Sequence, residues 1–289
     1  MKYYHYHDVD FRGSIERIYY KTTNRDGEMR NKYANVYLPY GYNGTDAAKR
    51  YNVLYLMHGG GGNPDAWLDC CMIKNMLDYA FSTKEADPMI VVFPTFYKEK
   101  VSRTGAPDPD YERGNVLLFQ QELVEELMPA VEGVYRTYAE NTTPEALQAA
   151  RDHRAFGGFS MGGATTWFVL THWPEYFSRF LPLSGDSWQL EPLGGRFKTK
   201  ETALFLHDFI RNSAFSPEEY HIFAATGTKD AANRSLTPQI EAMKVLDDVF
   251  HYSEDATQGN LHFLLADGEV HSYEAVYQYL YNYLPYLFA

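Results

Sequence analysis

The chain has 289 residues, 45% of them hydrophobic and 16% aromatic, enough to bury the core of one large α/β domain. Its formal net charge of −12 at pH 7 argues against nucleic acid and anionic membrane surfaces as partners, because both are negatively charged. No apolar stretch reaches the roughly 18 residues that a membrane-spanning helix needs. The first residues do not have the pattern of a signal peptide, which leaves the cellular compartment open.

The hydrophobic pattern predicts alternating strands and helices. Residues 14–23 and 30–38 alternate apolar and polar side chains around Asn24-Arg25-Asp26-Gly27, which predicts an antiparallel hairpin. Short apolar runs bounded by turn residues predict buried strands at 52–57, 89–93, 154–157, 178–183, 220–226 and 261–266. Helices are predicted at 66–81, 115–138, 161–172, 201–212, 238–250 and 272–283. This order predicts the α/β-hydrolase plan, a mostly parallel sheet with helices on both faces, in one domain over residues 1–289.

The only cysteines, Cys70 and Cys71, are adjacent in the sequence and lie in the predicted helix at 66–81. A disulfide between neighbouring residues is strained, so both are predicted to be free and buried thiols.

Residues 158–162 have the pattern Gly-x-Ser-x-Gly, with Ser160 at its centre. A serine hydroxyl is a poor nucleophile unless a base lies beside it and a sharp turn exposes its oxygen. The apolar run before Ser160 and the small and apolar residues after it predict a strand, a tight turn and a helix, the context in which this motif carries a nucleophile. Ser160 is therefore the predicted nucleophile.

Four consecutive glycines follow the predicted strand at 52–57, after His58. Such a loop lets backbone N–H groups face the oxygen of a substrate. Gly60 and Met161, the residue after the nucleophile, are the predicted donors to the oxyanion, with Gly61 as the alternative for the first. A flexible loop or a simple anion-binding nest is the competing interpretation. His58 is predicted to support the loop by hydrogen bonding.

A hydrolase of this plan carries its acid and then its histidine after the nucleophile in the chain. Asp230 directly follows the predicted strand at 220–226 and is the predicted acid, with Asp186 as the runner-up. His271 lies in the loop before the last predicted helix and is the predicted base. His262 lies within a predicted strand and is expected to pack there.

The pair His5 and His7 has the spacing of metal ligands, but no third ligand accompanies it. Neither a metal nor a cofactor is therefore predicted. The oligomeric state stays open.

Two segments carry a resemblance to a known family: residues 157–167 around Ser160, and residues 181–188, which end in Ser-Gly-Asp-Ser-Trp. They resemble the feruloyl (cinnamoyl) esterases of the first carbohydrate-esterase family, and residues 55–62 and 92–97 fit the same pattern. The resemblance covers roughly residues 15–285, and the glycine-rich loop is shared with the esterase D group. A departure is Gly60, at a position where a larger residue is common. A second feature is segment 98–113, predicted to be a long polar loop beyond a strand end and a candidate to shape the pocket, with a course that the sequence does not define.

This resemblance implies hydrolysis of ferulate esters carried by arabinoxylan or its oligosaccharides, and of small phenolic esters. It implies Ser160, Asp230 and His271 as the triad. Such enzymes are often modules of secreted xylanases. The resemblance also implies that Trp188 lies near the acyl or sugar site. A planar phenolic group favours aromatic walls with a few polar contacts. The predicted substrate contacts are Trp188, Asp186, Gly61 and Phe96, and Tyr97 and Trp67 also lie near the predicted catalytic edge.

Three alternatives stay open at this point. An acetyl-xylan or general carboxylesterase would use the same triad with a different acyl pocket. An acyltransferase would pass the acyl group to a sugar instead of water. A non-catalytic carbohydrate-binding module is the alternative from another class.

Overall fold

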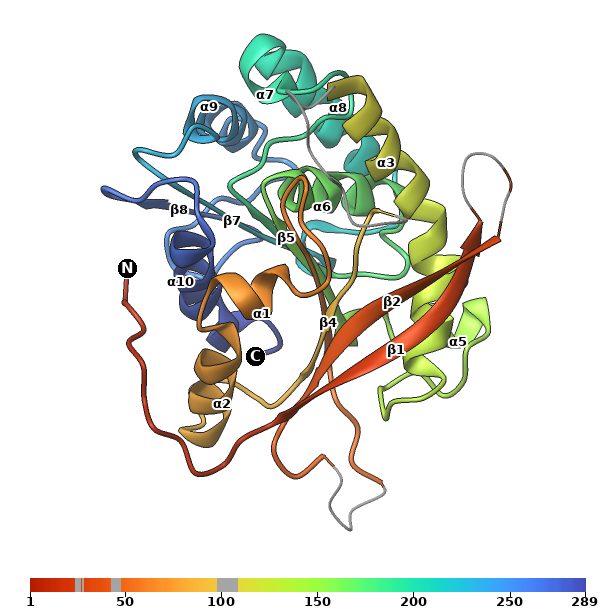
Figure 1. Ribbon diagram of the computed structural model, residues 1–289. Coiled ribbons are helices and arrows are strands. Elements are labelled where there is room, and N and C mark those ends of the chain that lie inside the picture. Colours follow the sequence, from red (N-terminus) through yellow and green to blue (C-terminus); the bar gives the residue numbers. More distant parts are fainter. Residues whose placement is uncertain (24–26, 28, 43–47, 98–108) are drawn as a thin grey trace.

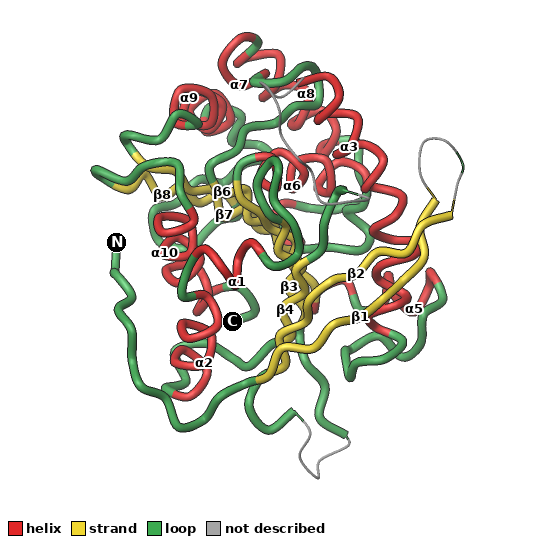
Figure 2. The backbone as a smooth tube through the Cα atoms, in the orientation of Figure 1, coloured by secondary structure: helices red, strands yellow, loops and turns green. Residues whose placement is uncertain are grey.

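The computed structural model describes residues 1–23, 27, 29–42, 48–97 and 109–289. Within this part of the chain, eight strands form one sheet in the order β1-β2-β4-β3-β5-β6-β7-β8 (Figures 1 and 2). The strands are β1 (Ser14–Thr23), β2 (Met29–Leu38), β3 (Val53–Met57), β4 (Ile90–Phe93), β5 (Arg154–Phe159), β6 (Arg179–Leu183), β7 (His221–Gly227) and β8 (Leu261–Ala266). The β1–β2 and β2–β4 pairs are antiparallel and the remaining neighbours are parallel. The predicted hairpin and mostly parallel sheet are confirmed; the turn residues 24–26 lie outside the described residues.

Helices cover both faces of the sheet (Figure 1). They are α1 (Ala66–Cys70), α2 (Ile73–Ser82), α3 (Pro109–Glu122), the π-helical turn Leu123–Leu127, α4 (Met128–Glu132), α5 (Pro144–Ala149), α6 (Met161–His172), α7 (Gly194–Phe197), α8 (Thr199–Arg211), α9 (Asn233–Lys244) and α10 (Tyr273–Tyr283). Alternate side chains of β3 enter different cores, since neighbouring residues of a strand point to opposite faces. Leu54 and Leu56 join the core under α1, α2 and α10, whereas Val53 and Tyr55 join the core under α3, α6, α8 and α9.

The structure corrects several predicted helix boundaries. The predicted helix at 66–81 is two helices, because the backbone is extended at Cys71, which separates α1 from α2. The predicted helix at 115–138 begins at Pro109 and ends at Glu132, with a π-helical turn inside it. Helix α9 begins five residues before the predicted start at 238 and continues through Pro238, whose missing N–H removes one bond without ending the helix.

The two cysteines are free, as predicted, but the prediction that both are buried is wrong. Cys70 is exposed and Cys71 is partly exposed. The prediction assumed one continuous buried helix, but α1 ends at Cys70 and the backbone at Cys71 is extended. Within the described ranges, no helix is long and apolar enough to cross a membrane.

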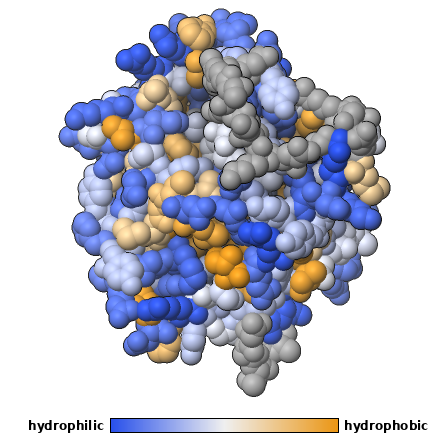
Figure 3. Space-filling view, in the orientation of Figure 1, coloured by the Kyte–Doolittle hydropathy of each residue, from blue (hydrophilic) through white to orange (hydrophobic). Residues whose placement is uncertain are grey.

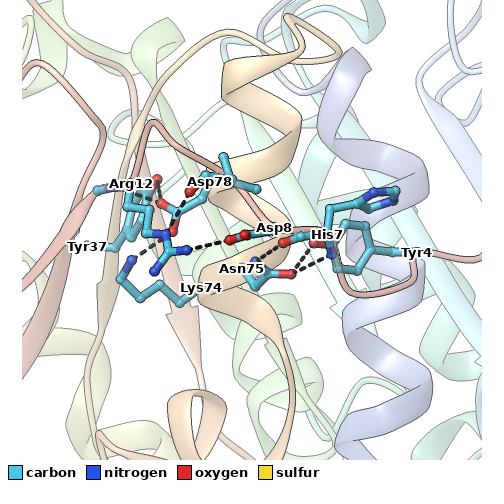
Figure 4. A network of polar contacts seen from close by, with 10 residues as sticks. Tyr4, His7, Asp8, Arg12, Tyr37, Lys74, Asn75 and Asp78 are labelled. Carbon is cyan, nitrogen blue, oxygen red and sulfur yellow. Dashed lines mark hydrogen bonds and ion pairs between the residues drawn. The ribbon is translucent and has the colours of Figure 1, made fainter.

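The N-terminal segment runs across the outer side of α2 and α10 and is held by side chains of both helices (Figures 1 and 4). Gln278 of α10 bonds both the N–H and the carbonyl of Tyr4, and Asn75 of α2 does the same for His7. The ring of His7 stacks on Tyr79 at 4.1 Å between centroids. The histidine pair near the N-terminus therefore has a packing role at His7, and no group of three metal-ligating side chains occurs among the described residues.

Asp78 closes this network at the start of β1 (Figure 4). Its buried carboxylate accepts hydrogen bonds from Gly13 N at 2.7 Å and Tyr37 Oη at 2.9 Å, and Lys74 Nζ lies 2.7 Å away. One carboxylate thus joins the N-terminal segment, a core strand and α2. In the orientation of Figure 1, most of the visible surface is hydrophilic and apolar residues gather toward its middle (Figure 3).

Candidate active site

Ser160 occupies the sharp turn between β5 and α6, at the carboxyl edge of the parallel strands. Its φ of 58° and ψ of −113° are rare for a residue with a side chain. A Cβ on Gly158 would lie 2.6 Å from the carbonyl carbon of Gly162, and one on Gly162 would lie 2.6 Å from the oxygen of Met57. Both glycines of the motif are thus required by the close approach of backbone, and the turn keeps Ser160 partly exposed.

His271 and Asp230 complete a hydrogen-bonded chain with Ser160. Nε2 of His271 lies 2.9 Å from Oγ of Ser160, and Nδ1 lies 2.7 Å from Oδ1 of Asp230. The aspartate follows β7 and the histidine precedes α10, so three separate loops meet at one edge of the sheet. Because a carboxylate only accepts hydrogen bonds, Nδ1 carries the proton and Nε2 faces the serine hydroxyl as an acceptor.

The environment of Asp230 favours its charged form. Burial alone would raise its pKa, but the hydrogen bond and charge of His271 and the N–H of Ala232 hold the pKa below the usual range. The side chain of Asp230 is 0% exposed, whereas that of His271 is 36% exposed. The carboxylate is therefore a fixed negative charge behind an imidazole that reaches the solvent-facing side.

The glycine-rich loop after β3 presents one backbone donor without a protein partner among the described residues. Gly59 N donates to Tyr273 Oη at 3.1 Å, Gly61 N to Tyr97 Oη at 2.9 Å and Gly62 N to the carbonyl of Gly59 at 3.1 Å. The N–H of Gly60 is the one left over, which favours Gly60 over Gly61 as the oxyanion donor. Met161 is the first residue of α6, so its N–H has no carbonyl within the helix to bond.

His58 supports this loop from beneath, as the sequence predicted. Its Nδ1 lies 2.7 Å from the carbonyl of Gly59 and its Nε2 lies 2.7 Å from Oγ1 of Thr95. Burial lowers the pKa of His58 to about 4, so the ring is neutral near pH 7. A neutral ring that donates from Nδ1 to a carbonyl must accept from the threonine hydroxyl at Nε2. His58 is thus part of the scaffold and does not reach Ser160.

A cavity of about 890 Å³ opens at Ser160 and His271. An apolar part of the lining consists of Trp188, Pro192 and Leu193, from the segment between β6 and α7. Another part of the lining is polar and consists of Asn63, Asp69, Cys70, Ser272 and Glu274, from the start of α1 and the start of α10. The cavity is large enough for an aromatic acid together with part of the alcohol to which it is esterified.

The predicted substrate contacts divide into two groups. Trp188 and Gly61 line the cavity, and Arg113 of α3 fixes the tryptophan's backbone by donating to the carbonyls of Trp188 and Gln189 at 2.8 and 2.7 Å. Tyr97 lies behind the glycine-rich loop, and Trp67 is buried with its Nε1 donating to the carbonyl of Met57.

Asp186 and Phe96 are predicted substrate contacts, but neither lines the cavity. Asp186 is buried, accepts a hydrogen bond from Gly195 N at 2.9 Å and supports α7 instead of the cavity. Burial raises the pKa of Asp186 to about 6. His271 is hydrogen-bonded to Asp230, so Asp230 and not Asp186 is the acid that pairs with the histidine. Phe96 is buried against His58, Tyr97 and Phe119. Both residues follow strand ends, but their side chains turn into the interior.

Several cavity residues were not predicted from the sequence. Leu193 has a left-handed backbone with φ of 59°, and Glu274 lies just after the base. Segment 98–113 is predicted from the sequence to be a polar loop that shapes the pocket, but its residues 109–113 are helical. Residues 98–108 lie outside the described residues, whereas Pro109 and Glu112 of α3 line the cavity. Glu274 lies only three residues after His271 in the sequence, which is a signal that could have found it, whereas Leu193 has no such signal.

Comparisons with known proteins agree with this geometry. A family model described as "Putative esterase" matches residues 28–283. The chain is 42% identical over 258 residues to endo-1,4-beta-xylanase Y of Acetivibrio thermocellus, which covers 89% of this chain and 22% of that protein. The chain therefore spans about a fifth of the length of this curated relative.

Solved structures show the same similarity. A variant of the feruloyl esterase module of Clostridium thermocellum, complexed with sinapinate, has a TM-score of 0.81 and 40% identity, with 98% of this chain and 90% of that chain covered. The S-formylglutathione hydrolase FrmB of Staphylococcus aureus shares the fold at a TM-score of 0.64 and 14% identity, with 98% and 100% covered. These neighbours confirm the predicted α/β-hydrolase plan. The chain belongs to the esterase family of the matching model, and the resemblance to feruloyl esterases predicted from its sequence is confirmed.

Proposed function

We propose that this chain hydrolyses hydroxycinnamoyl esters, feruloyl esters above all, carried by arabinoxylan or its oligosaccharides. The observation that carries the proposal is the hydrogen-bonded chain from Asp230 through His271 to Ser160, at the opening of a cavity with an apolar wall. The chain is 40% identical to a feruloyl esterase module whose structure was solved with sinapinate, a hydroxycinnamate, and this identity supports the choice of acyl group.

The proposed reaction proceeds through an ester on Ser160. His271 Nε2 accepts the proton of the serine hydroxyl as Oγ attacks the carbonyl carbon of the substrate, and Asp230 stabilises the imidazolium that forms. The N–H groups of Gly60 and Met161 donate to the oxyanion of the tetrahedral intermediate. When the intermediate collapses, the bond to the sugar oxygen breaks and His271 gives that oxygen its proton.

Water completes the cycle in the second half of the reaction. His271 accepts a proton from water as the water oxygen attacks the acyl carbon. The bond between the acyl carbon and Ser160 Oγ then breaks as the imidazolium returns the proton to the serine. The products are the free hydroxycinnamic acid and the sugar hydroxyl. Every group in these steps belongs to the chain, the ester or water, so the proposed mechanism uses no cofactor.

The apolar wall is the proposed site of the phenolic ring. Trp188 offers a flat face, Pro192 and Leu193 extend it, and Arg113 holds the tryptophan's backbone in place. Burying an aromatic ring against such a wall contributes roughly 25 cal/mol per Å² of apolar surface removed from water. An acetyl group has no ring to bury there, so this wall favours a hydroxycinnamoyl group over acetate.

Release of free acids from feruloylated arabinoxylan tests the proposal. The wild-type protein should release ferulate, detected by chromatography, and Ser160→Ala should release none above the blank. The same incubation with acetylated xylan separates the related carboxylesterase activity. Release of acetate without ferulate would overturn the feruloyl assignment and retain the serine esterase.

We further propose that residues 1–289 form one esterase domain. The single sheet, with the N-terminal segment bonded to α2 and α10, supports this arrangement. A single calorimetric unfolding transition is expected, and two separable transitions would contradict it.

A further inference from the structure

Three consecutive peptide units in the glycine-rich loop are each held by a different side chain. The unit before Gly59 donates its N–H to Tyr273 Oη, and the unit between Gly59 and Gly60 has its carbonyl bonded by His58 Nδ1. The next unit, between Gly60 and Gly61, donates its N–H to Tyr97 Oη at 2.9 Å. A peptide unit is planar, so fixing one polar group of a unit fixes the direction of the other.

The hydroxyl of Tyr97 has a defined orientation. It lies 2.8 Å from Oε2 of Glu112, a buried side chain of α3, and a carboxylate can only accept a hydrogen bond. The Tyr97 proton therefore points to Glu112, which leaves an oxygen lone pair for the N–H of Gly61. The same oxygen lies 3.7 Å from Sδ of Met161, the residue that carries the second proposed oxyanion donor.

The loop needs such support because of its sequence. Glycine populates many backbone conformations, and Gly61 has a φ of 73°, in the left-handed region. The N–H of Gly60 belongs to the unit that His58 holds through the carbonyl of Gly59. Displacement of the next unit, between Gly60 and Gly61, would shift the Cα that the two units share and so change the direction of the Gly60 N–H. His58 and Tyr97 hold the two units on either side of that Cα, so Gly60 is fixed from both directions.

We propose that Tyr97 and Glu112 are positioning residues for the oxyanion loop, with the Glu112 carboxylate orienting the Tyr97 hydroxyl and that hydroxyl holding Gly61. The inference rests on the proposed function, in which Gly60 donates to the oxyanion. Neither residue touches the reacting atoms in this role. Their contribution appears in the transition state, where charge develops on the substrate oxygen, and not in the binding of the uncharged ester.

Tyr97→Phe is the direct test, since it removes one oxygen atom. Because loss of an oxyanion donor costs about 10²–10³-fold in kcat, loss of its support should lower kcat by roughly tenfold, with KM within about twofold of wild type. The loss should be equal for methyl ferulate and 4-nitrophenyl acetate, since the oxyanion is common to both. Tyr42→Phe is the matched control: its hydroxyl also accepts a backbone N–H, that of Arg136 at 2.9 Å, at a site away from the cavity.

Phenylboronic acid provides a readout that a merely structural role would not change. It forms a tetrahedral adduct on an active-site serine, with an oxygen placed like the oxyanion. Tyr97→Phe should weaken phenylboronate inhibition by the same factor as kcat, whereas the affinity for ferulate, the planar product, should not change. Titration of active sites with a fluorophosphonate corrects both values for any unfolded fraction.

Glu112 gives a second pair of variants, which also serves if Tyr97→Phe does not fold. Glu112→Gln keeps an oxygen that accepts the tyrosine proton and should stay within about threefold of wild-type kcat, whereas Glu112→Leu should lose about as much as Tyr97→Phe. The double variant Tyr97→Phe with Glu112→Leu should lose no more than either single change, because the two residues act as one unit.

The outcomes separate this inference from the proposed function. Wild-type activity on 4-nitrophenyl acetate but not methyl ferulate would remove the feruloyl assignment and leave the loop test intact. An active wild type with unchanged kcat and phenylboronate affinity in Tyr97→Phe would overturn the inference alone. A rise in KM that accounts for the whole loss would do so as well, and a wild type inactive on both esters would overturn both.

Discussion

The carboxylate of Asp230 is fully buried, and its Oδ1 lies 2.7 Å from Nδ1 of His271, whose ring is partly exposed to solvent. The pair thus joins a fixed charge in the interior to a base at the edge of the cavity. This arrangement holds the imidazole in one tautomer, with Nε2 toward Ser160.

Asp230→Asn should separate this role from simple hydrogen bonding. The amide can donate to Nδ1 and so favours the wrong tautomer of His271, which should lower kcat by on the order of 10³–10⁴-fold with little change in KM. Steady-state kinetics with methyl ferulate measure the effect. Retention of more than about a tenth of wild-type kcat would contradict the role of Asp230.

Asp186→Asn should affect stability and its pH dependence. Burial raises the pKa of Asp186 to about 6 from an ordinary value of 3.8, so its ionisation destabilises the folded state as the pH rises from about 4 through 6. Asparagine does not ionise and so avoids this cost. The difference in free energy of unfolding, variant minus wild type, should therefore increase by on the order of 3 kcal/mol as the pH rises through this interval. Urea unfolding at pH 4 and pH 7 measures the difference, and a gain that is the same at both pH values would exclude the titration of Asp186 as its cause.

Trp188→Ala should weaken recognition of the aromatic acyl group. Loss of an apolar contact in a binding pocket costs about 1–3 kcal/mol, so KM for methyl ferulate should rise roughly tenfold while KM for 4-nitrophenyl acetate changes little. Leu190→Ala is a suitable control, because Leu190 is an exposed apolar residue on the same segment. An equal rise in KM for both esters would remove Trp188 from ferulate recognition.

Gly162→Ala should disrupt the turn that presents Ser160. The added Cβ would lie 2.6 Å from the carbonyl oxygen of Met57 and 2.8 Å from that of His58, both of which are backbone atoms that cannot move aside alone. Overpacking of this kind costs about 1–3 kcal/mol, and the displaced turn should also lower kcat by at least about tenfold. Thermal unfolding and fluorophosphonate labelling measure the two effects; a variant with wild-type values for both would show that the turn relaxes freely.

Asp78→Leu should destabilise the protein without altering its chemistry. The change leaves Gly13 N–H and the buried Tyr37 hydroxyl without their acceptor, at a cost of about 1–3 kcal/mol for each buried donor left unsatisfied, and the partly exposed Lys74 without its partner. The folded fraction should keep wild-type kcat, since Asp78 lies beneath the N-terminal segment (Figure 4). Chemical denaturation and active-site titration check both statements, and a loss of kcat per titrated site would contradict the separation.

The central part of the site could be predicted because its residues follow the ends of parallel strands in a fixed order. Ser160 follows β5 and Asp230 follows β7, and the carboxyl ends of parallel strands meet at one edge. His271 lies in the loop after β8 at the same edge. A single sequence contains this information, because it shows how many residues separate each of these side chains from the end of a predicted strand and which glycines flank Ser160.

The walls of the cavity could not be predicted in the same way. Asp186 and Phe96 also follow strand ends, but side chains after a strand can turn to either side, and both enter the interior. Leu193 and Glu112 reach the cavity from a loop and a helix whose courses depend on tertiary packing. Cys70 became exposed because a helix predicted as continuous ends after it. These positions depend on contacts between distant segments, which hydrophobic periodicity does not encode.

The central claim is that a hydroxycinnamoyl ester forms on Ser160 during turnover. Rapid acid quenching of the wild-type protein with methyl ferulate, followed by digestion and tandem mass spectrometry, tests it most directly. The account predicts a feruloyl group on the peptide that contains Ser160, and neither this group nor ferulate release with Ser160→Ala. Ferulate release by Ser160→Ala at the wild-type rate, with Ser160 unmodified in the quenched wild type, would contradict the account.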